Sequence, residues 1–534
     1  MNRRAESPVH AASAEAWARH LERSRPVRPS ALRRWLAGGT IPALAERTLR
    51  SRRDETVLQA AGKAVRGSEL LEASAEVARR LGDAGIAAGD RVLLSLPTSI
   101  EFVAAYLGIL RAGCSVVLAN PALTGPELER TRELARPVGG IVSPAVREVL
   151  GGAAAKGSAI ALSAEAVLVG LSDGEVPGET VGGPSGEAVF AATSGSTGLP
   201  KGVPLTHANV LSSIRAVMAA WRWTPDDVVV HCLPLYHQHG LGSLHALMAG
   251  GGRTVIGSRF DPEEVAAVVD SERASVLLGV PAMYQRLVES PPRRERFASL
   301  RLVVSGSAPL PPVLFERVEE VTGQVPLERY GTTESGLDVS NLYAGPRRPG
   351  SVGYPLPGVE VKVGTVAEQA GAGEDGEVLV RGPQVFSGYV GAGAAGEDAL
   401  VPGGWFRTGD IGRVDEEDGS LSITGRSKDV IISGGMNVYP REVELVLEQH
   451  PRVAALAVAG VASQRWGEAV CAFVVAGPEG PPGRGELEEL CRRSLAPYKR
   501  PKRFLLVGEL PRNHMGKVLR ASLARLAATA DELG

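Results

Sequence analysis

The stretch Thr193-Ser-Gly-Ser-Thr-Gly-Leu-Pro-Lys-Gly202 places four hydroxyl side chains, three glycines and one lysine within ten residues. Glycine lets the backbone approach an anion closely and turn its N–H groups toward it. Hydroxyl groups are hydrogen-bond donors, and lysine adds a compact positive charge. We therefore expect a loop that binds phosphate groups through Thr193, Ser194, Gly195, Ser196, Thr197, Gly198 and Lys201.

This loop is not a Walker A motif, which needs Gly-Lys followed by Ser or Thr at the start of a helix. Here Lys201 is followed by Gly202-Val-Pro-Leu-Thr206, a pattern typical of extended chain. The alternative is a flexible surface loop, because glycine makes up 65 of the 534 residues and an isolated pair carries little information. The order of glycines, hydroxyls and lysine favours phosphate binding.

The composition sets limits on the protein class. A chain of 534 residues is too long for one core, so two or more domains are expected. The net charge of −2 gives no reason to expect a nucleic-acid partner. The four cysteines form no CxxC pair, which fits a reducing cytoplasm and argues against a disulfide framework. No apolar run reaches membrane-spanning length, so we expect a cytoplasmic protein.

Helix and strand patterns alternate from Leu44 onward. Ser68 to Leu81 has helical periodicity, and the apolar run Val92–Leu96 predicts a buried parallel strand. Ser99 is placed to cap the next helix. Repeated strand–helix units predict a doubly wound α/β sheet whose faces are covered by helices.

Several polar motifs follow predicted strands, and ligands bind at the carboxyl ends of strands in such folds. Four of the nine histidines fall between His231 and His245, but without a neighbouring carboxylate a strand-end turn is favoured over a metal site. Glu334 is a hard oxygen ligand suited to Mg²⁺. The motifs are Pro234-Leu-Tyr-His-Gln-His-Gly240, Ser305-Gly-Ser-Ala-Pro309 and Tyr330-Gly-Thr-Thr-Glu334.

Arg286 lies in the predicted helix Pro281–Glu289, three residues after Met283 and therefore at the border of its buried face. One interpretation is an anion-binding residue at the end of the strand Ala274–Val280. The other is a solvated arginine next to Glu289.

The C-terminal part begins after a predicted hairpin turned at Asp418-Gly419. About a hundred residues follow Gly425-Arg-Ser-Lys-Asp429, enough to fold alone as an α+β unit. Near the end stands Pro511-Arg-Asn-His-Met-Gly-Lys-Val518. Lys517 is expected to begin the last helix, and a cation at the N-terminal end of a helix interacts unfavourably with the helix dipole. Residues that are unfavourable for local structure are candidates for function, so Lys517 is one.

These motifs, in this order, resemble the adenylate-forming superfamily of acyl-CoA synthetases, adenylation domains and firefly-type luciferases. The resemblance runs from about Leu44 to Leu526. It implies a large N-terminal domain of doubly wound sheets with a β-barrel-like subdomain, followed by a small, mobile α+β domain. The expected parts are an Arg-rich arm (1–40), an AMP-binding domain (41–426) and a C-terminal domain (427–534) with its hinge near Lys428.

The resemblance also implies residue roles. Catalysis would fall to Lys517, Thr333 and Glu334, with Mg²⁺ bound by Glu334. His237 would line the acyl pocket, and Gly434 would lie at the mouth of the tunnel for the pantetheine of coenzyme A. Further ATP contacts would come from the adenine and ribose sites, made by Ser305, Gly306, Ser307, Tyr330, Gly331, Thr332, Asp410 and Arg426.

The implied reaction is ATP-dependent formation of an acyl-adenylate, followed by thiol attack that releases AMP. Within the superfamily, Tyr330–Asn341 and Val280–Arg286 look most like malonyl-CoA synthetases, in which the arginine at the Arg286 position pairs with the second carboxylate of malonate or methylmalonate. Asp338 departs from their pattern, and a negative charge there would disfavour a dicarboxylate. The alternatives are a medium-chain or aryl monocarboxylate–CoA ligase and an adenylating enzyme that loads a carrier protein.

Overall fold

The computed structural model describes residues 38–150, 160–163, 166–170, 183–194, 200–257, 259–365, 367–391, 398–433, 436–512 and 518–533. Most of the expected N-terminal arm lies outside these residues, as do Gly195 to Gly198, Gly434 and Lys517. Within the described part, no helix combines the length and apolar character needed to cross a membrane.

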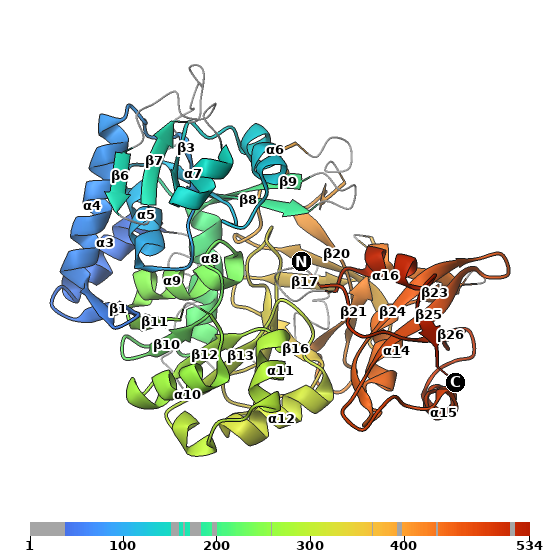
Figure 1. Ribbon diagram of the computed structural model, residues 1–534. Coiled ribbons are helices and arrows are strands. Elements are labelled where there is room, and N and C mark those ends of the chain that lie inside the picture. The colour runs from blue at the N-terminus through green and yellow to red at the C-terminus, as the bar shows by residue number, and fades with distance from the viewer. Residues whose placement is uncertain are drawn as a thin grey trace, which may run out of the picture.

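The first sheet has seven strands in the order β6-β7-β5-β3-β4-β8-β9 (Figure 1). Its central strands β5, β3, β4 and β8 are parallel, and β9 pairs antiparallel with β8. The strands are β3 (Arg91–Ser95), β4 (Ser115–Leu118), β5 (Gly139–Val142), β6 (Ile160–Ser163), β7 (Ala166–Gly170), β8 (Glu187–Ser194) and β9 (Pro200–Thr206). Its helices are α4 (Gly67–Asp83), α5 (Ile100–Arg111), α6 (Gly125–Ala135) and α7 (Pro144–Leu150).

The second sheet contains the parallel run β14-β13-β12-β10-β11-β1, with β2 pairing antiparallel at the edge. Its strands are β1 (Thr56–Ala60), β2 (Lys63–Arg66), β10 (Val228–His231), β11 (Arg253–Ile256), β12 (Val276–Gly279), β13 (Leu302–Ser305) and β14 (Leu327–Tyr330). The accompanying helices are α3 (Ile41–Ser51), α8 (His207–Ala220), α9 (Gln238–Gly250), α10 (Pro262–Ser271), α11 (Pro281–Glu289), the 3-10 helix η1 (Arg294–Phe297) and α12 (Pro312–Thr322).

One apolar core joins the two sheets. It contains Phe102 of α5, Val116 of β4, Leu211 of α8 and Val276 of β12. A separate core, with Leu277 at its centre, packs α10, α11 and α12 on the other face of the second sheet. Both faces of the parallel strands are therefore covered, as the sequence predicted.

An antiparallel extension continues from β14 in the order β15, β16, β21, β20, β18, β17. It forms the expected second part of the large domain and leads directly into the predicted hinge. Its strands are β15 (Val339–Ser340), β16 (Ser351–Pro355), β17 (Glu360–Val363), β18 (Asp375–Arg381), β19 (Leu400–Val401), β20 (Trp405–Val414) and β21 (Leu421–Arg426).

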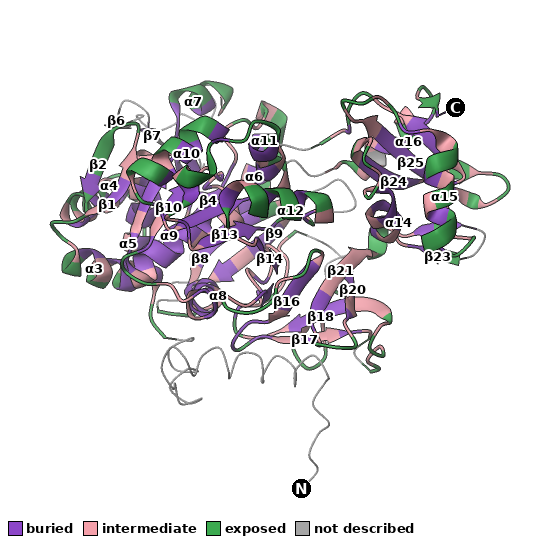
Figure 2. Ribbon diagram, turned by 90° about the horizontal axis from the view of Figure 1, so that it is seen from below, coloured by how far each residue is buried: buried purple, intermediate pink, exposed green. Residues whose placement is uncertain are grey.

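The C-terminal α+β unit has its own cores, so buried residues fill each of the two lobes in Figure 2. It follows the 3-10 helix η2 (Ser427–Asp429), which contains Lys428. Its elements are β22 (Ile431–Ser433), β23 (Met436–Val438), α14 (Pro440–Leu447), β24 (Val453–Ser463), β25 (Gly467–Ala476), α15 (Arg484–Ser494), β26 (Arg503–Leu506), α16 (Arg520–Leu526) and β27 (Asp531–Glu532).

Local patterns predicted many of these elements correctly. The helix at Pro281–Glu289 has the predicted bounds. Ser99 caps α5, since its hydroxyl accepts a hydrogen bond from the Phe102 N–H at 3.2 Å. The last helix is a correction, because α16 begins at Arg520 and not at Lys517.

Candidate active site

A cavity of about 590 Å³ lies where the turns after β10, β13 and β14 meet β9, β20 and η2. These turns are at the carboxyl ends of parallel strands, where ligands bind in open α/β sheets. The structure brings many of the predicted residues together around this one space. Those that line it are Thr193, Lys201, His237, Ser307, Gly331, Thr332, Thr333, Glu334, Asp410, Arg426 and Lys428.

The predicted ribose site is assembled from three elements. The Tyr330 hydroxyl donates a hydrogen bond to Asp410 Oδ2 at 2.7 Å. Arg426 Nε lies 2.8 Å from Asp410 Oδ1, because the two residues are directly paired across the β20–β21 hairpin. Burial, together with the nearby Asp410 carboxylate, raises the pKa of Tyr330 well above its usual value. A carboxylate fixed at the cavity wall is suited to accept hydrogen bonds from ribose hydroxyls.

Glu334 is connected to the phosphate-loop strand through Tyr389, a residue that the sequence did not single out. The Tyr389 hydroxyl donates to Glu334 Oε1 at 2.7 Å, and Lys201 Nζ lies 4.9 Å from the centre of the Tyr389 ring. The backbones of Gly202 and Val390 exchange two hydrogen bonds of 2.9 Å. Glu334 therefore contacts the hydroxyl of Tyr389 while Lys201 lies over the ring of the same residue, an arrangement that fits a magnesium-bound phosphate chain.

The turn after β13 packs tightly against Arg329. A Cβ atom on Gly306 would lie 2.3 Å from Arg329 Nε, closer than any real contact, so a larger residue here would force the Arg329 side chain to move. Ser307 has a left-handed φ of 69°, and its hydroxyl lies 3.1 Å from His239 Nδ1. The turn therefore places the Ser307 hydroxyl and the Arg329 side chain in the same cavity.

Arg329 is the main site residue that sequence reasoning missed. It lines the cavity but is only 8% exposed. Among the described residues, its Nε and Nη2 groups have no hydrogen-bond partner. Burial lowers the pKa of its guanidinium to about 10, so it is still a cation at neutral pH. The sequence contained one indication, because an arginine within the otherwise buried strand Leu327–Tyr330 is unusual.

Arg286, by contrast, does not reach the cavity. Its side chain is exposed and lies 6.0 Å from the centre of the Phe260 ring. Helix α11 buries Tyr284, Leu287 and Val288, which share one face. Arg286 is two positions from Tyr284 and therefore points away from that face. Arg286 is not among the residues that line the cavity, and its pairing with a substrate carboxylate stays a prediction.

Asp338 also lies outside the cavity wall. It is fully buried and accepts hydrogen bonds from Ser335 Oγ and from Gln384 Nε2, the latter at 3.1 Å. Burial raises the pKa of Asp338 to about 7. Its carboxyl group is therefore hydrogen-bonded within the protein, and Asp338 is not among the residues that line the cavity.

The histidine-rich turn forms hydrogen bonds within the core. His231 Nδ1 lies 2.8 Å from the Ser243 hydroxyl, and His245 Nε2 lies 2.7 Å from the Tyr106 hydroxyl. Burial lowers the pKa of His231 to about 4 and that of His245 to about 3, so both rings are neutral. In the described part of the chain, no three His, Cys, Asp or Glu side chains are grouped to hold a metal.

Comparisons with known proteins identify the family of the chain. Residues 45–390 match the family described as AMP-binding enzyme, and residues 442–517 match the AMP-binding enzyme C-terminal domain. The chain is 38% identical to the mitochondrial malonate–CoA ligase of Homo sapiens over 66% of its own length and 67% of that protein. It is 32% identical to a long-chain-fatty-acid–CoA ligase of Bacillus subtilis over 88% of its length and 91% of that protein.

Among solved structures, ATP-bound MatB from Rhodopseudomonas palustris is 34% identical with a TM-score of 0.82, over 91% of this chain and 99% of that one. These matches confirm the expected fold and the expected class of activity, an AMP-forming acid–CoA ligase. The chain belongs to the family of AMP-binding enzymes.

Proposed function

We propose that this enzyme joins a small dicarboxylic acid, malonate or methylmalonate, to the thiol of coenzyme A with cleavage of ATP to AMP and pyrophosphate. The observation that carries the choice of acid is the buried guanidinium of Arg329 at the cavity wall. The similarity to a malonate–CoA ligase supports the same choice.

The physical reason is the cost of an unpaired buried charge. A buried guanidinium whose N–H groups have no partner is destabilising unless a ligand supplies an acceptor. The planar N–H fork at Arg329 Nε and Nη2 matches the two oxygens of a carboxylate. A dicarboxylate satisfies this site with one carboxylate and presents the other to the nucleotide, whereas a monocarboxylate leaves the guanidinium unpaired.

In the proposed adenylation step, the free carboxylate attacks the α-phosphorus of ATP, and pyrophosphate leaves with the bond electrons. Thr193 and Lys201 bind the phosphates, and Asp410 accepts hydrogen bonds from the ribose. Glu334 would hold Mg²⁺, which when bound would supply positive charge for the leaving pyrophosphate. Lys517 stabilises the charge that develops between carboxylate and phosphate.

In the second step, the thiol of coenzyme A attacks the acyl carbonyl of the adenylate, loses its proton and displaces AMP. We propose that rotation about Lys428 withdraws Lys517 and brings Gly434 to the thiol tunnel. Lys428 lines the cavity at the junction of the two lobes, a position that supports this role.

The test replaces Arg329 by methionine, which keeps an unbranched apolar stem and removes the guanidinium with its charge. Loss of one partner of a buried ion pair costs about 2–5 kcal/mol, so kcat/KM for malonate should fall between roughly 30-fold and several thousand-fold. The KM for ATP should stay unchanged. The assay is malonate-dependent exchange of pyrophosphate into ATP.

Arg286→Met is the matched variant, since it removes the arginine that the sequence favoured. It should leave malonate turnover within about twofold, because an exposed side chain away from the site contributes little. Full activity of Arg329→Met, or a selective loss of malonate turnover in Arg286→Met, would contradict the assignment.

A medium-chain monocarboxylate–CoA ligase is the second candidate. The observation in its favour is a row of apolar side chains on α8, formed by Val210, Ile214 and Val217, that lines part of the cavity. Such an enzyme would prefer hexanoate or octanoate to malonate in the same exchange assay.

A further inference from the structure

Helix α8 forms one wall along the length of the cavity. The α8 residues that line the cavity share one face of the helix and begin at Asn209. Trp221, which directly follows the last residue of α8, lines the cavity as well. Twelve residues of helix span about 18 Å. At the N-terminal end of α8, Asn209 Nδ2 donates to the carbonyl oxygens of Pro383 and Val385 at 2.8 and 2.9 Å. The position of the C-terminal end depends on the contacts that hold Trp221.

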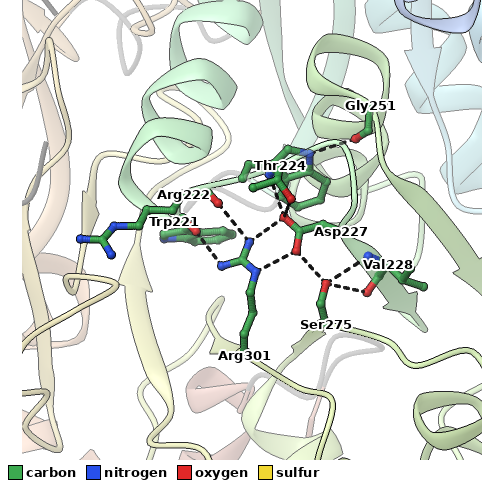
Figure 3. Close-up of polar contacts among 9 residues, drawn as sticks. Trp221, Arg222, Thr224, Asp227, Val228, Gly251, Ser275 and Arg301 are labelled. Carbon is green, nitrogen blue, oxygen red and sulfur yellow. Dashed lines mark hydrogen bonds and ion pairs between the residues drawn. The ribbon is translucent and has the colours of Figure 1, made fainter. Parts of the chain in front are cut away.

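The guanidinium of Arg301 holds the C-terminal end of α8. Figure 3 shows the Arg301 side chain between the backbone carbonyls of Trp221 and Arg222 and the carboxylate of Asp227. Arg301 Nη1 donates to the Trp221 carbonyl at 2.9 Å, and Nη2 lies 3.4 Å from the Arg222 carbonyl. A cation at these carbonyls satisfies hydrogen-bond acceptors that are left free at the C-terminal end of a helix, and it interacts favourably with the helix dipole. Arg222 itself has a left-handed φ of 51°, so the chain turns sharply here.

Asp227 fixes the guanidinium in turn. Its two carboxylate oxygens accept from Arg301 Nε at 2.7 Å and from Nη2 at 2.6 Å. It also accepts from the Ser275 hydroxyl at 2.7 Å and from the Thr224 N–H at 2.8 Å (Figure 3). Burial by itself would raise the pKa of Asp227, but the hydrogen bonds from Arg301, Ser275 and Thr224 lower it below its usual value. The carboxylate is therefore ionised at neutral pH.

We call the ion pair of Asp227 and Arg301 the clasp. The Trp221 indole connects the clasp to β15, the strand that pairs with the Arg329 strand β14. Its Nε1–H donates to the Ser340 hydroxyl at 2.9 Å. Ser340 on β15 is directly paired with Arg329 on β14. Directly opposed residues of an antiparallel pair point to the same face of the sheet, about 5 Å apart at Cβ. Trp221 is thus bonded to the immediate neighbour of Arg329.

We infer that Asp227 and Arg301 are positioning residues for the acid end of the cavity, acting through Trp221 and Ser340 on the surroundings of Arg329. Neither residue of the clasp lines the cavity, whereas Trp221 does. The inference rests on the proposed function insofar as Arg329 binds the acid. The nucleotide end has its own supports at Asp410 and Glu334, so the clasp acts on one substrate and not on the other.

The test is Asp227→Asn, which keeps the size of the side chain and removes the charge that orients Arg301. We expect the KM for the acid to rise about tenfold, while the KM for ATP stays within about twofold. Quenching of tryptophan fluorescence by acrylamide should increase, because Trp221 becomes less firmly held. Ser340→Ala, a small change that removes only the indole acceptor, should also raise the KM for the acid selectively.

The control is Glu272→Gln, which removes the ion pair between Arg253 on β11 and Glu272 at the end of α10. The side chains of Arg253 and Glu272 are 21% and 23% exposed, against 23% and 2% for Arg301 and Asp227, and neither Arg253 nor Glu272 lines the cavity. Glu272→Gln should leave both KM values unchanged. The inference is refuted if Asp227→Asn raises both KM values in parallel, if it changes neither, or if Glu272→Gln gives the same acid-selective defect.

Failure of the proposed function is a separate result. If the proposed function is wrong, malonate turnover will be unchanged in Arg329→Met, and this result does not depend on Asp227 or Arg301. The acid-to-ATP split of Asp227→Asn can be measured with whichever acid the enzyme uses best.

Discussion

Replacement of Gly306 by alanine should displace the Arg329 guanidinium and weaken acid binding while leaving ATP binding intact. The added Cβ would lie 2.3 Å from Arg329 Nε and 2.5 Å from its Cζ. Ordinary contact begins at 3.4 Å, so the guanidinium must move by roughly 1 Å. A misplacement of that size costs on the order of 100-fold in rate, and kcat/KM for malonate should fall by about that factor.

The assay is malonate-dependent pyrophosphate exchange, with the KM for ATP measured in parallel. Gly306→Ala in an Arg329→Met background should cause no further loss, because the clash then has no guanidinium to displace. Additive losses in the double variant, or a rise in the KM for ATP equal to that for malonate, would refute the reasoning. Either result would place the effect of Gly306 on the nucleotide and not on Arg329.

Two further predictions concern Asp338 and Tyr389. Asp338 has a folded pKa of about 7 against an ordinary 3.8, so its contribution to stability falls as pH rises from about 4 to about 7. About two pH units of this fall lie above pH 5, so Asp338→Asn should stabilise the protein at pH 8 relative to pH 5 by up to about 3 kcal/mol. An equal effect of the substitution at both pH values in urea unfolding would contradict this. Tyr389→Phe removes the hydroxyl bound to Glu334 and should lower kcat about tenfold with a higher Mg²⁺ requirement; a normal Mg²⁺ titration would argue against the bridge.

The sequence predicted the features that depend on local pattern. An apolar run located β3, and the turns after β10, β13 and β14 were placed correctly at the cavity because parallel strands end at one edge. Asp410 and Glu334 also reach that edge, since each belongs to a short motif attached to a strand.

The contacts between distant segments could not be predicted in this way. Tyr389 meets Glu334 because two long-range backbone contacts hold its segment: the Phe386 N–H donates to the Glu334 carbonyl at 2.8 Å, and Gly202 and Val390 pair across 188 residues. The orientation of Arg286 depended on which side of α11 is buried, and the sequence pattern placed this arginine at the border of the buried side. The sequence did not single out Arg329 as a residue that binds the acid. Lys517 and Gly434, whose roles came from resemblance alone, stay predictions.

The central claim is that the cavity binds a dicarboxylate through Arg329 while ATP is bound at its other end. The most direct measurement compares malonate with butyrate in the exchange of pyrophosphate into ATP by the unaltered enzyme. Malonate should support exchange at least about 30-fold better than butyrate, because only malonate pairs with the buried guanidinium. Equal or faster exchange with butyrate would contradict it.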